Sequence, residues 1–156
     1  MFESLETSSL AIWVGESLWG YPIMLGMHAV GLAIVVGIFL MLDLRILGFN
    51  KGVAYSSFIS LFKVAWIGLT INALSGVALF SSQATVFIEN TPFLIKISCI
   101  VAGVVCSILI LRQLKLHADA FDDGGSKPSG KLIGLAAVSV LCWISAIIAG
   151  RLIAYL

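Results

Sequence analysis

The chain has 156 residues, of which 60% are hydrophobic and 11% are charged, and its formal net charge is +1. Soluble domains carry about 25% charged residues, so this composition excludes a soluble globular protein and predicts one integral membrane domain, residues 1–156. The small net charge also argues against nucleic-acid binding, because no basic patch is present to neutralise phosphates.

The first segment, residues 1–20, is predicted to form a short helix that lies in the membrane interface. Apolar residues such as Leu5 and Trp13 alternate there with Ser, Thr and Glu at roughly helical spacing. This pattern is typical of an interfacial amphipathic helix. Trp19 and Tyr21 fall where the aromatic belt of a membrane protein is expected.

Four apolar segments follow, and each is long enough to cross the hydrocarbon core, which takes about 20 helical residues. Their expected bounds are 21–47, 55–80, 91–116 and 132–155. The polar, Gly/Ser/Pro-rich residues 119–131 are predicted to form a cytoplasmic loop. The apolar segments do not alternate at period two, which argues against strands. We therefore predict an all-α fold, a polytopic membrane four-helix bundle.

The basic residues predict the orientation of this bundle. Those expected on one side are Arg45, Lys51, Lys63, Arg112, Lys115, Lys127 and Lys131, and those on the other are Lys96 and Arg151. The positive-inside rule places the first group in the cytoplasm and both termini in the periplasm. The charge pattern is typical of a bacterial inner-membrane protein. The expected partner of the chain is the lipid bilayer.

Small residues at helical spacing are expected to mark the seams where the helices approach closely. The expected seams are Ala29, Ala33 and Gly37; Ala65, Gly68, Asn72 and Gly76; Cys99, Gly103 and Ser107; and Gly134, Ala137, Leu141, Ser145 and Ala149. Each set favours helix packing, and each could also make room for a flat cofactor.

One level of the predicted bundle collects polar side chains from all four spans. At 1.5 Å per residue, His28 lies about 10 Å from the outer surface, and Lys96 and Arg151 lie about 6 Å from it. Asn72 and Ser75 lie roughly 7–12 Å from the outer end of the second span. A lone charge in hydrocarbon costs several kcal/mol, and no carboxylate falls in this layer. The layer therefore indicates a site for an anionic ligand.

Haem b meets these requirements, and we predict that it binds in the outer half of the bundle. His28 would ligate the iron through a neutral ring nitrogen, and Lys96 and Arg151 would pair with the propionates. Gly31, almost one turn below His28, would leave space over the ring. The expected role is electron transfer, with an unidentified redox partner. A redox activity stays open, whereas no hydrolase or transferase motif is found.

Two other interpretations remain open. In the first, the chain handles copper through Met24, Met27 and His28, because Met24 lies one turn from His28 on the same helix face. In the second, the chain is a non-catalytic scaffold or subunit. Lys96 and Arg151 would then reach lipid headgroups, and His28 would hydrogen-bond a carbonyl group or Ser75.

The second histidine, His117, is expected at the inner end of the third span, too far from His28 to share its haem. The sixth iron position could stay open or take a methionine, Lys96 or the His28 of a second protomer. Bundle size and this shortage of histidines predict a homo-oligomer.

Asp43 and Arg45 lie at the inner end of the first span. Two residues apart on a helix, their side chains do not face each other. Each is expected to meet a partner on another helix or the headgroups.

The stretches 28–32, 43–48, 76–80 and 92–96 (HAVGL, DLRILG, GVALF and PFLIK) resemble a family of small four-helix bacterial inner-membrane proteins of unknown function. The matching stretches cover the first three spans. The resemblance implies the fold and the location. The pattern is also distantly similar to copper-resistance membrane proteins and four-helix b-type cytochromes, which implies a copper or haem cofactor.

Overall fold

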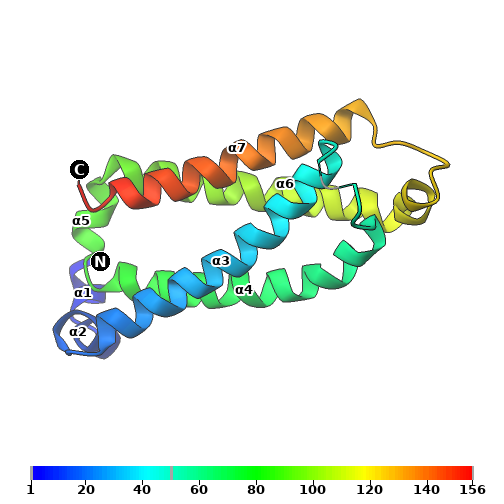
Figure 1. The fold of residues 1–156 in the computed structure, drawn as a ribbon. Coiled ribbons are helices and arrows are strands. Elements are labelled where there is room, and N and C mark those ends of the chain that lie inside the picture. The colour runs from blue at the N-terminus through cyan, green and yellow to red at the C-terminus, as the bar shows by residue number, and fades with distance from the viewer. Residues whose placement is uncertain (1, 50, 156) are drawn as a thin grey trace.

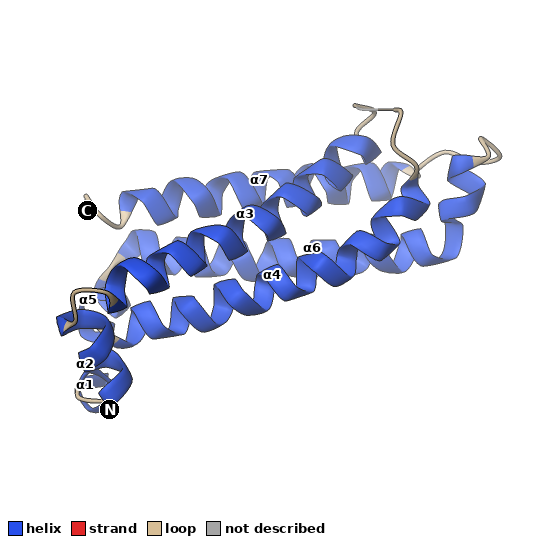
Figure 2. Cartoon of the chain, turned by 60° about the horizontal axis from the view of Figure 1, so that its bottom comes forward, coloured by secondary structure: helices blue, strands red, loops and turns tan. Residues whose placement is uncertain are grey.

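The computed structural model describes residues 2–49 and 51–155, and residues 1, 50 and 156 lie outside it. Within these ranges the chain is helical and contains no strand. In chain order the helices are α1 (Phe2–Glu6), α2 (Ser9–Glu16), α3 (Gly20–Ile46), α4 (Tyr55–Ser81), α5 (Ala84–Glu89), α6 (Thr91–Asp122) and α7 (Gly130–Leu152). The predicted all-α four-helix bundle is confirmed (Figures 1 and 2).

The four long helices, α3, α4, α6 and α7, are each long and apolar enough to cross a membrane. The chain is therefore a multi-pass membrane protein. Consecutive helices pair into two hairpins, α3–α4 and α6–α7. The hairpins diverge toward the end that carries both termini, α1, α2 and α5 (Figure 1). We call this the terminal end, and the opposite end, with residues 47–49, 51–54 and 123–129, the loop end.

The polar segment 119–131 is predicted to be a loop throughout, and this is wrong at both ends, because α6 continues to Asp122 and α7 begins at Gly130. The carboxylate of Asp122 accepts the backbone N–H groups of Tyr55 at 2.6 Å and Ser56 at 3.0 Å. These are first-turn N–H groups of α4, which have no partner within their own helix. The last turn of α6 therefore caps α4, and α6 ends just before Gly124, whose φ is 74°.

The terminal end also differs in detail from the prediction. The segment expected as one interfacial helix is two, α1 and α2, and Ser8 caps α2 by accepting the N–H of Ala11 at 3.3 Å. Serine favours such a cap over a helix interior, which explains the break. The short helix α5 was not predicted. At the loop end, Gly48 lies in the turn that follows α3, and its φ of 97° favours glycine.

The predicted seams are right for α4 and wrong for much of α3 and α7. On α4, Ala65, Gly68 and Asn72 are buried, and Gly68 meets Gly31 of α3. The expected seam residues that are exposed are Ala29, Ala33 and Gly37 on α3, and Gly134, Leu141 and Ser145 on α7. Small residues occur on more than one face of these helices, so spacing alone does not identify the packed face.

The hydrophobic core lies in the loop-end half of the bundle. Phe39 of α3 is its centre, with ring centroids 5.4 Å from Phe62 of α4 and 5.5 Å from Trp143 of α7. Ile110 and Leu114 of α6 are fully buried in the same cluster. The helices are therefore fixed mainly by packing in one half, which leaves room between the hairpins in the other.

Glu6 ties α1 to α5 at the terminal end. Its Oε1 atom accepts the Thr85 hydroxyl at 2.7 Å and the Thr85 backbone N–H at 2.8 Å. These two hydrogen bonds, the side-chain one first, hold the pKa of the Glu6 carboxyl below its ordinary value. The carboxylate therefore stabilises this contact at neutral pH, and the effect is lost as the pH falls through the lowered pKa.

We expect the protection of the Thr85 amide from hydrogen exchange to fall as the pH drops below the ordinary pKa of a glutamate, about 4.3, and through the lowered pKa of Glu6. In Glu6→Ala this amide should be weakly protected at every pH, since the acceptor is gone. Protection that stays constant across the acid range in the parent chain would contradict the assignment.

Candidate functional site

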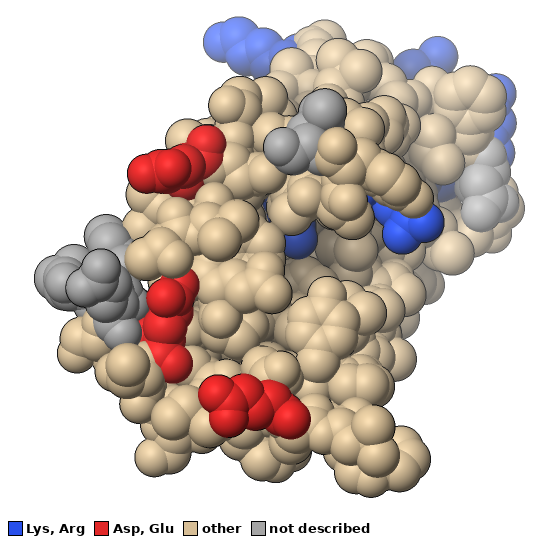
Figure 3. All heavy atoms as spheres, turned by 90° about the vertical axis from the view of Figure 1, so that its left-hand side faces the viewer, with Lys and Arg blue, Asp and Glu red and all other residues tan. Residues whose placement is uncertain are grey.

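A cavity of about 420 Å³ lies between α4 and α6 in the terminal-end half of the bundle. Its size falls within the range of small-molecule sites, about 300–1,000 Å³. The wall is apolar except for His28, Asn72 and Lys96. A space-filling view of the terminal end shows a hollow there, with basic atoms at its border and acidic side chains elsewhere on the face (Figure 3).

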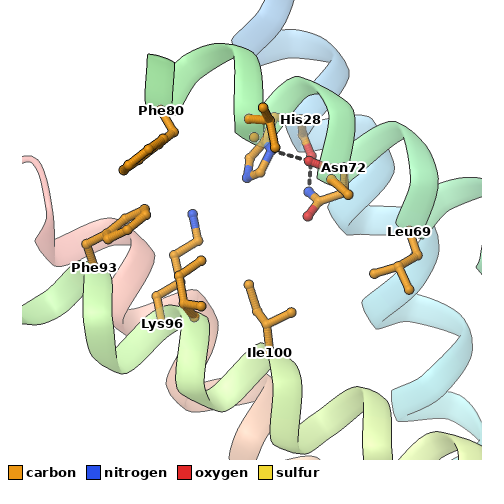
Figure 4. Close-up of a pocket in the computed structure, with 11 residues that line it drawn as sticks. His28, Leu69, Asn72, Phe80, Phe93, Lys96 and Ile100 are labelled. Carbon is orange, nitrogen blue, oxygen red and sulfur yellow. Dashed lines mark hydrogen bonds between the residues drawn. The ribbon is translucent and has the colours of Figure 1, made fainter. Parts of the chain in front are cut away.

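His28 and Asn72 hold each other across the α3–α4 contact. His28 Nδ1 lies 3.0 Å from the backbone oxygen of Asn72, and Asn72 Nδ2 donates to the backbone oxygen of His28 at 2.8 Å. A carbonyl oxygen only accepts, so Nδ1 carries the ring proton and Nε2 keeps a lone pair. Figure 4 shows the ring at the wall of the cavity. Metal-ligating histidines commonly donate their other ring nitrogen to a carbonyl group in this way.

Two residues of α4 set the position of this imidazole. Ser75 is buried behind it, with Oγ 3.3 Å from Nδ1, while its own hydroxyl donates to Ile71 O at 2.6 Å. Gly76 lies beside the ring, where a Cβ atom would come within 3.1 Å of Cε1. The ring therefore has a fixed hydrogen-bond partner and little freedom to tilt toward α4.

Lys96 reaches from α6 across the cavity toward His28 (Figure 4). Its side chain crosses Gly150 of α7, where a Cβ atom would lie 3.3 Å from Cδ and 3.5 Å from Nζ. No carboxylate occurs among the described residues that line the cavity. The ammonium group of Lys96 is thus directed into an apolar cavity whose described lining residues include no carboxylate to pair with it.

The remaining predicted site residues lie outside this cavity. Arg151 is exposed, and its Nη2 donates to Tyr155 Oη at 3.3 Å. Gly31 does not leave space over a ring, because it packs on α4, where a Cβ atom would lie 2.7 Å from Asn72 N. Met24 is half-buried and does not line the cavity. The structure therefore brings together His28, Asn72 and Lys96 with Ser75 behind, and leaves out Arg151, Gly31 and Met24.

Sequence reasoning missed the aromatic residues that close the terminal end of the cavity. Phe80 of α4 and Phe93 of α6 line it, and their ring centroids are 5.5 Å apart. Phe87 of α5 stacks on both, at 6.3 Å from Phe80 and 5.4 Å from Phe93. A signal was available for Phe93, which precedes Lys96 by three residues and so shares its helix face.

The second histidine, His117, lies at the loop end. It is exposed, with Nδ1 3.2 Å from Gln113 O and its ring stacked on Phe121. Within residues 2–49 and 51–155, no group of three or more His, Cys, Asp or Glu side chains could hold a metal ion. Metal binding at the cavity therefore rests on one imidazole.

The cavity combines a lone pair on an oriented imidazole, an ammonium group and an aromatic end wall. These features suit a largely apolar ligand that carries both an electron-pair acceptor and an anionic group. No protein-family model, curated protein or solved structure matches the chain.

Proposed function

We propose that the chain is a membrane protein that binds b-type haem in the cavity between α4 and α6 and takes part in electron transfer. The observation that carries the proposal is the hydrogen bond from His28 Nδ1 to Asn72 O. It fixes the tautomer in which Nε2 is free to ligate iron, and it raises the basicity of that nitrogen.

The other lining residues support the same ligand. Lys96 supplies a cation for a propionate group, and such charge-assisted contacts are about twice as strong as neutral ones. Phe80, Phe93 and the aliphatic wall offer apolar surface to a macrocycle and exclude water from it. Haem, when bound, supplies one-electron chemistry. The chain's own residues orient the axial imidazole and hold the counter-charge.

The location and assembly belong to the same proposal. Basic residues such as Arg45, Lys63 and Lys131 lie toward the loop end, which favours that end in the cytoplasm and both termini in the periplasm of a bacterial inner membrane. With one histidine on the described cavity wall, and Lys96 assigned to a propionate, a second iron ligand would come from an exogenous molecule or from a second protomer. The last of these favours a homo-oligomer.

The copper alternative loses its methionine ligands, because neither Met24 nor Met27 lines the cavity. A scaffold role is compatible with the hydrogen bond of His28 to a carbonyl group. The scaffold interpretation expects Lys96 to reach lipid headgroups. Its side chain is instead directed toward His28 inside the apolar cavity (Figure 4), and a scaffold gives this ammonium group no role.

One set of measurements on purified full-length protein tests the proposal. Absorption spectra are recorded before and after dithionite, with haem extraction and metal analysis of the same sample. We expect a Soret band that shifts on reduction, with iron as the bound metal. Copper without a Soret band would support copper handling, and a colourless, metal-free protein from haem-supplied cells would support a scaffold.

The two cations should contribute unequally. Lys96→Ala is expected to speed haem loss to excess apomyoglobin by about tenfold or more, since a charge-assisted hydrogen bond is worth about 1.5–3 kcal/mol. Arg151→Ala should change the rate by less than about twofold, because its exposed guanidinium group contacts Tyr155 instead of the cavity. A larger effect of Arg151 than of Lys96 would contradict the propionate assignment.

A further inference from the structure

A second polar site lies in the loop-end half, between α3 and α7. Asp43 of α3 is 1% exposed, and its Oδ2 atom has no hydrogen-bond partner within the described residues. Ser139 of α7 is 0% exposed, and its Oγ atom is also without a partner there. Trp143 Nε1, one turn from Ser139 on α7, is a third such atom, and buried polar atoms without partners in a native bundle require a physical explanation.

The helix pairing brings these two residues to one level. Phe39 and Asp43 are one turn apart on α3, and Trp143 and Ser139 are one turn apart on α7. Phe39 packs on Trp143, with ring centroids 5.5 Å apart. The two helices run in opposite directions, so the next turn toward the loop end places Asp43 opposite Ser139. The hydroxyl approaches the carboxyl without completing a hydrogen bond to Oδ2.

We expect Asp43 to meet a partner on another helix, but no cation among the described residues pairs with its carboxyl group. Arg45 is directed elsewhere, with Nε donating to Val53 O at 2.7 Å and its guanidinium group 4.2 Å from the Tyr55 ring centroid. From α6, the buried thiol of Cys106 lies near Asp43 and carries no positive charge. The other lysine and arginine residues of this half have exposed side chains: Lys51 and Lys127 in the connections, Lys63 on α4, Arg112 and Lys115 on α6, and Lys131 on α7.

An ionised carboxylate in these surroundings would cost several kcal/mol, because no cation offsets its desolvation. A protonated carboxyl is neutral and gains an O–H donor. That donor can bond to Ser139 Oγ, which gives Asp43 Oδ2 and Ser139 Oγ a hydrogen bond.

We propose that Asp43 and Ser139 form a buried proton-binding site, in which the Asp43 carboxylic acid donates its proton to Ser139 Oγ. The ligand is the proton itself. On release, the O–H bond of the acid breaks, the proton passes to a water molecule, and the carboxylate keeps the electron pair. The site is separate from the cavity of His28 and does not depend on bound haem.

Infrared spectroscopy of the full-length protein near pH 7 tests this assignment. We expect a C=O stretching band of a protonated carboxylic acid that shifts in D₂O and is lost in Asp43→Asn, a variant of nearly identical shape. Asp119→Asn, in which an exposed acid of α6 is changed, should retain the band. Ser139→Ala should retain the band at a shifted frequency, since the acceptor of the O–H group is removed.

Three outcomes would overturn the proposal. The first is a parent protein without the acid band. The second is a band that persists unchanged in Asp43→Asn or does not move in Ser139→Ala. The third is a Na⁺-dependent rise in thermal stability that Asp43→Asn abolishes, because the site would then hold a carboxylate with a metal cation.

Discussion

Replacing His28 with alanine is expected to reduce bound haem to background and to abolish the dithionite-sensitive Soret band. The substitution removes the nitrogen that we assign as the iron ligand, together with the hydrogen bond to Asn72 O. The cavity wall offers no other histidine among the described residues. The measurement is the haem-to-protein ratio of the purified variant, alongside a helical circular dichroism spectrum to confirm folding.

Two further variants separate loss of the ligand from loss of the fold. His117→Ala should keep the haem content of the parent chain, because His117 is exposed at the loop end. His28→Gly should regain a Soret band when imidazole is added, since the free base can occupy the vacated position. Full haem content in His28→Ala would sink the ligand assignment.

Adding one methyl group to Gly31 is expected to have the second large effect. A Cβ atom at this position would lie 2.7 Å from Asn72 N and 2.8 Å from Gly68 O, both backbone atoms of α4. Backbone atoms cannot turn aside as a flexible side chain can, so α3 and α4 must separate. Overpacking of this kind costs about 1–3 kcal/mol. The separation also strains the paired hydrogen bonds between His28 and Asn72, so haem content should fall too.

Gly37→Ala is the matched control for this experiment. Gly37 lies in the same helix, and its added Cβ atom would meet nothing within 4 Å. Alanine is also a better helix former than glycine, so the control should match or slightly exceed the parent stability. Thermal unfolding in detergent measures both variants. Equal midpoints for Gly31→Ala and Gly37→Ala would contradict the close contact of the helix backbones.

The fold could be predicted from the sequence because long apolar segments allow few solutions. Each span must satisfy its own backbone hydrogen bonds in lipid, so helices follow from length and composition. The end of α6 could not be predicted in this way. Its last turn is polar, and it stays helical to Asp122, whose carboxylate caps α4 across 66 or 67 residues of chain.

The site could be predicted only in part, because depth along a helix can be read from a sequence and direction around the helix cannot. Depth correctly grouped His28, Asn72 and Lys96, which all line one cavity. Arg151 lies next to Gly150, which contacts Lys96, yet its own side chain is directed to Tyr155. Gly31 illustrates the same limit, since a residue nearly one turn from His28 faces the neighbouring helix instead of the cavity.

The central claim is that the Nε2 lone pair of His28 binds iron, and hyperfine spectroscopy of the oxidised protein with ¹⁵N-labelled histidine tests it most directly. The account predicts coupling between the haem iron and a histidine nitrogen, unchanged in His117→Ala and absent in His28→Ala. A haem signal without histidine coupling, or coupling that survives in His28→Ala, would contradict it.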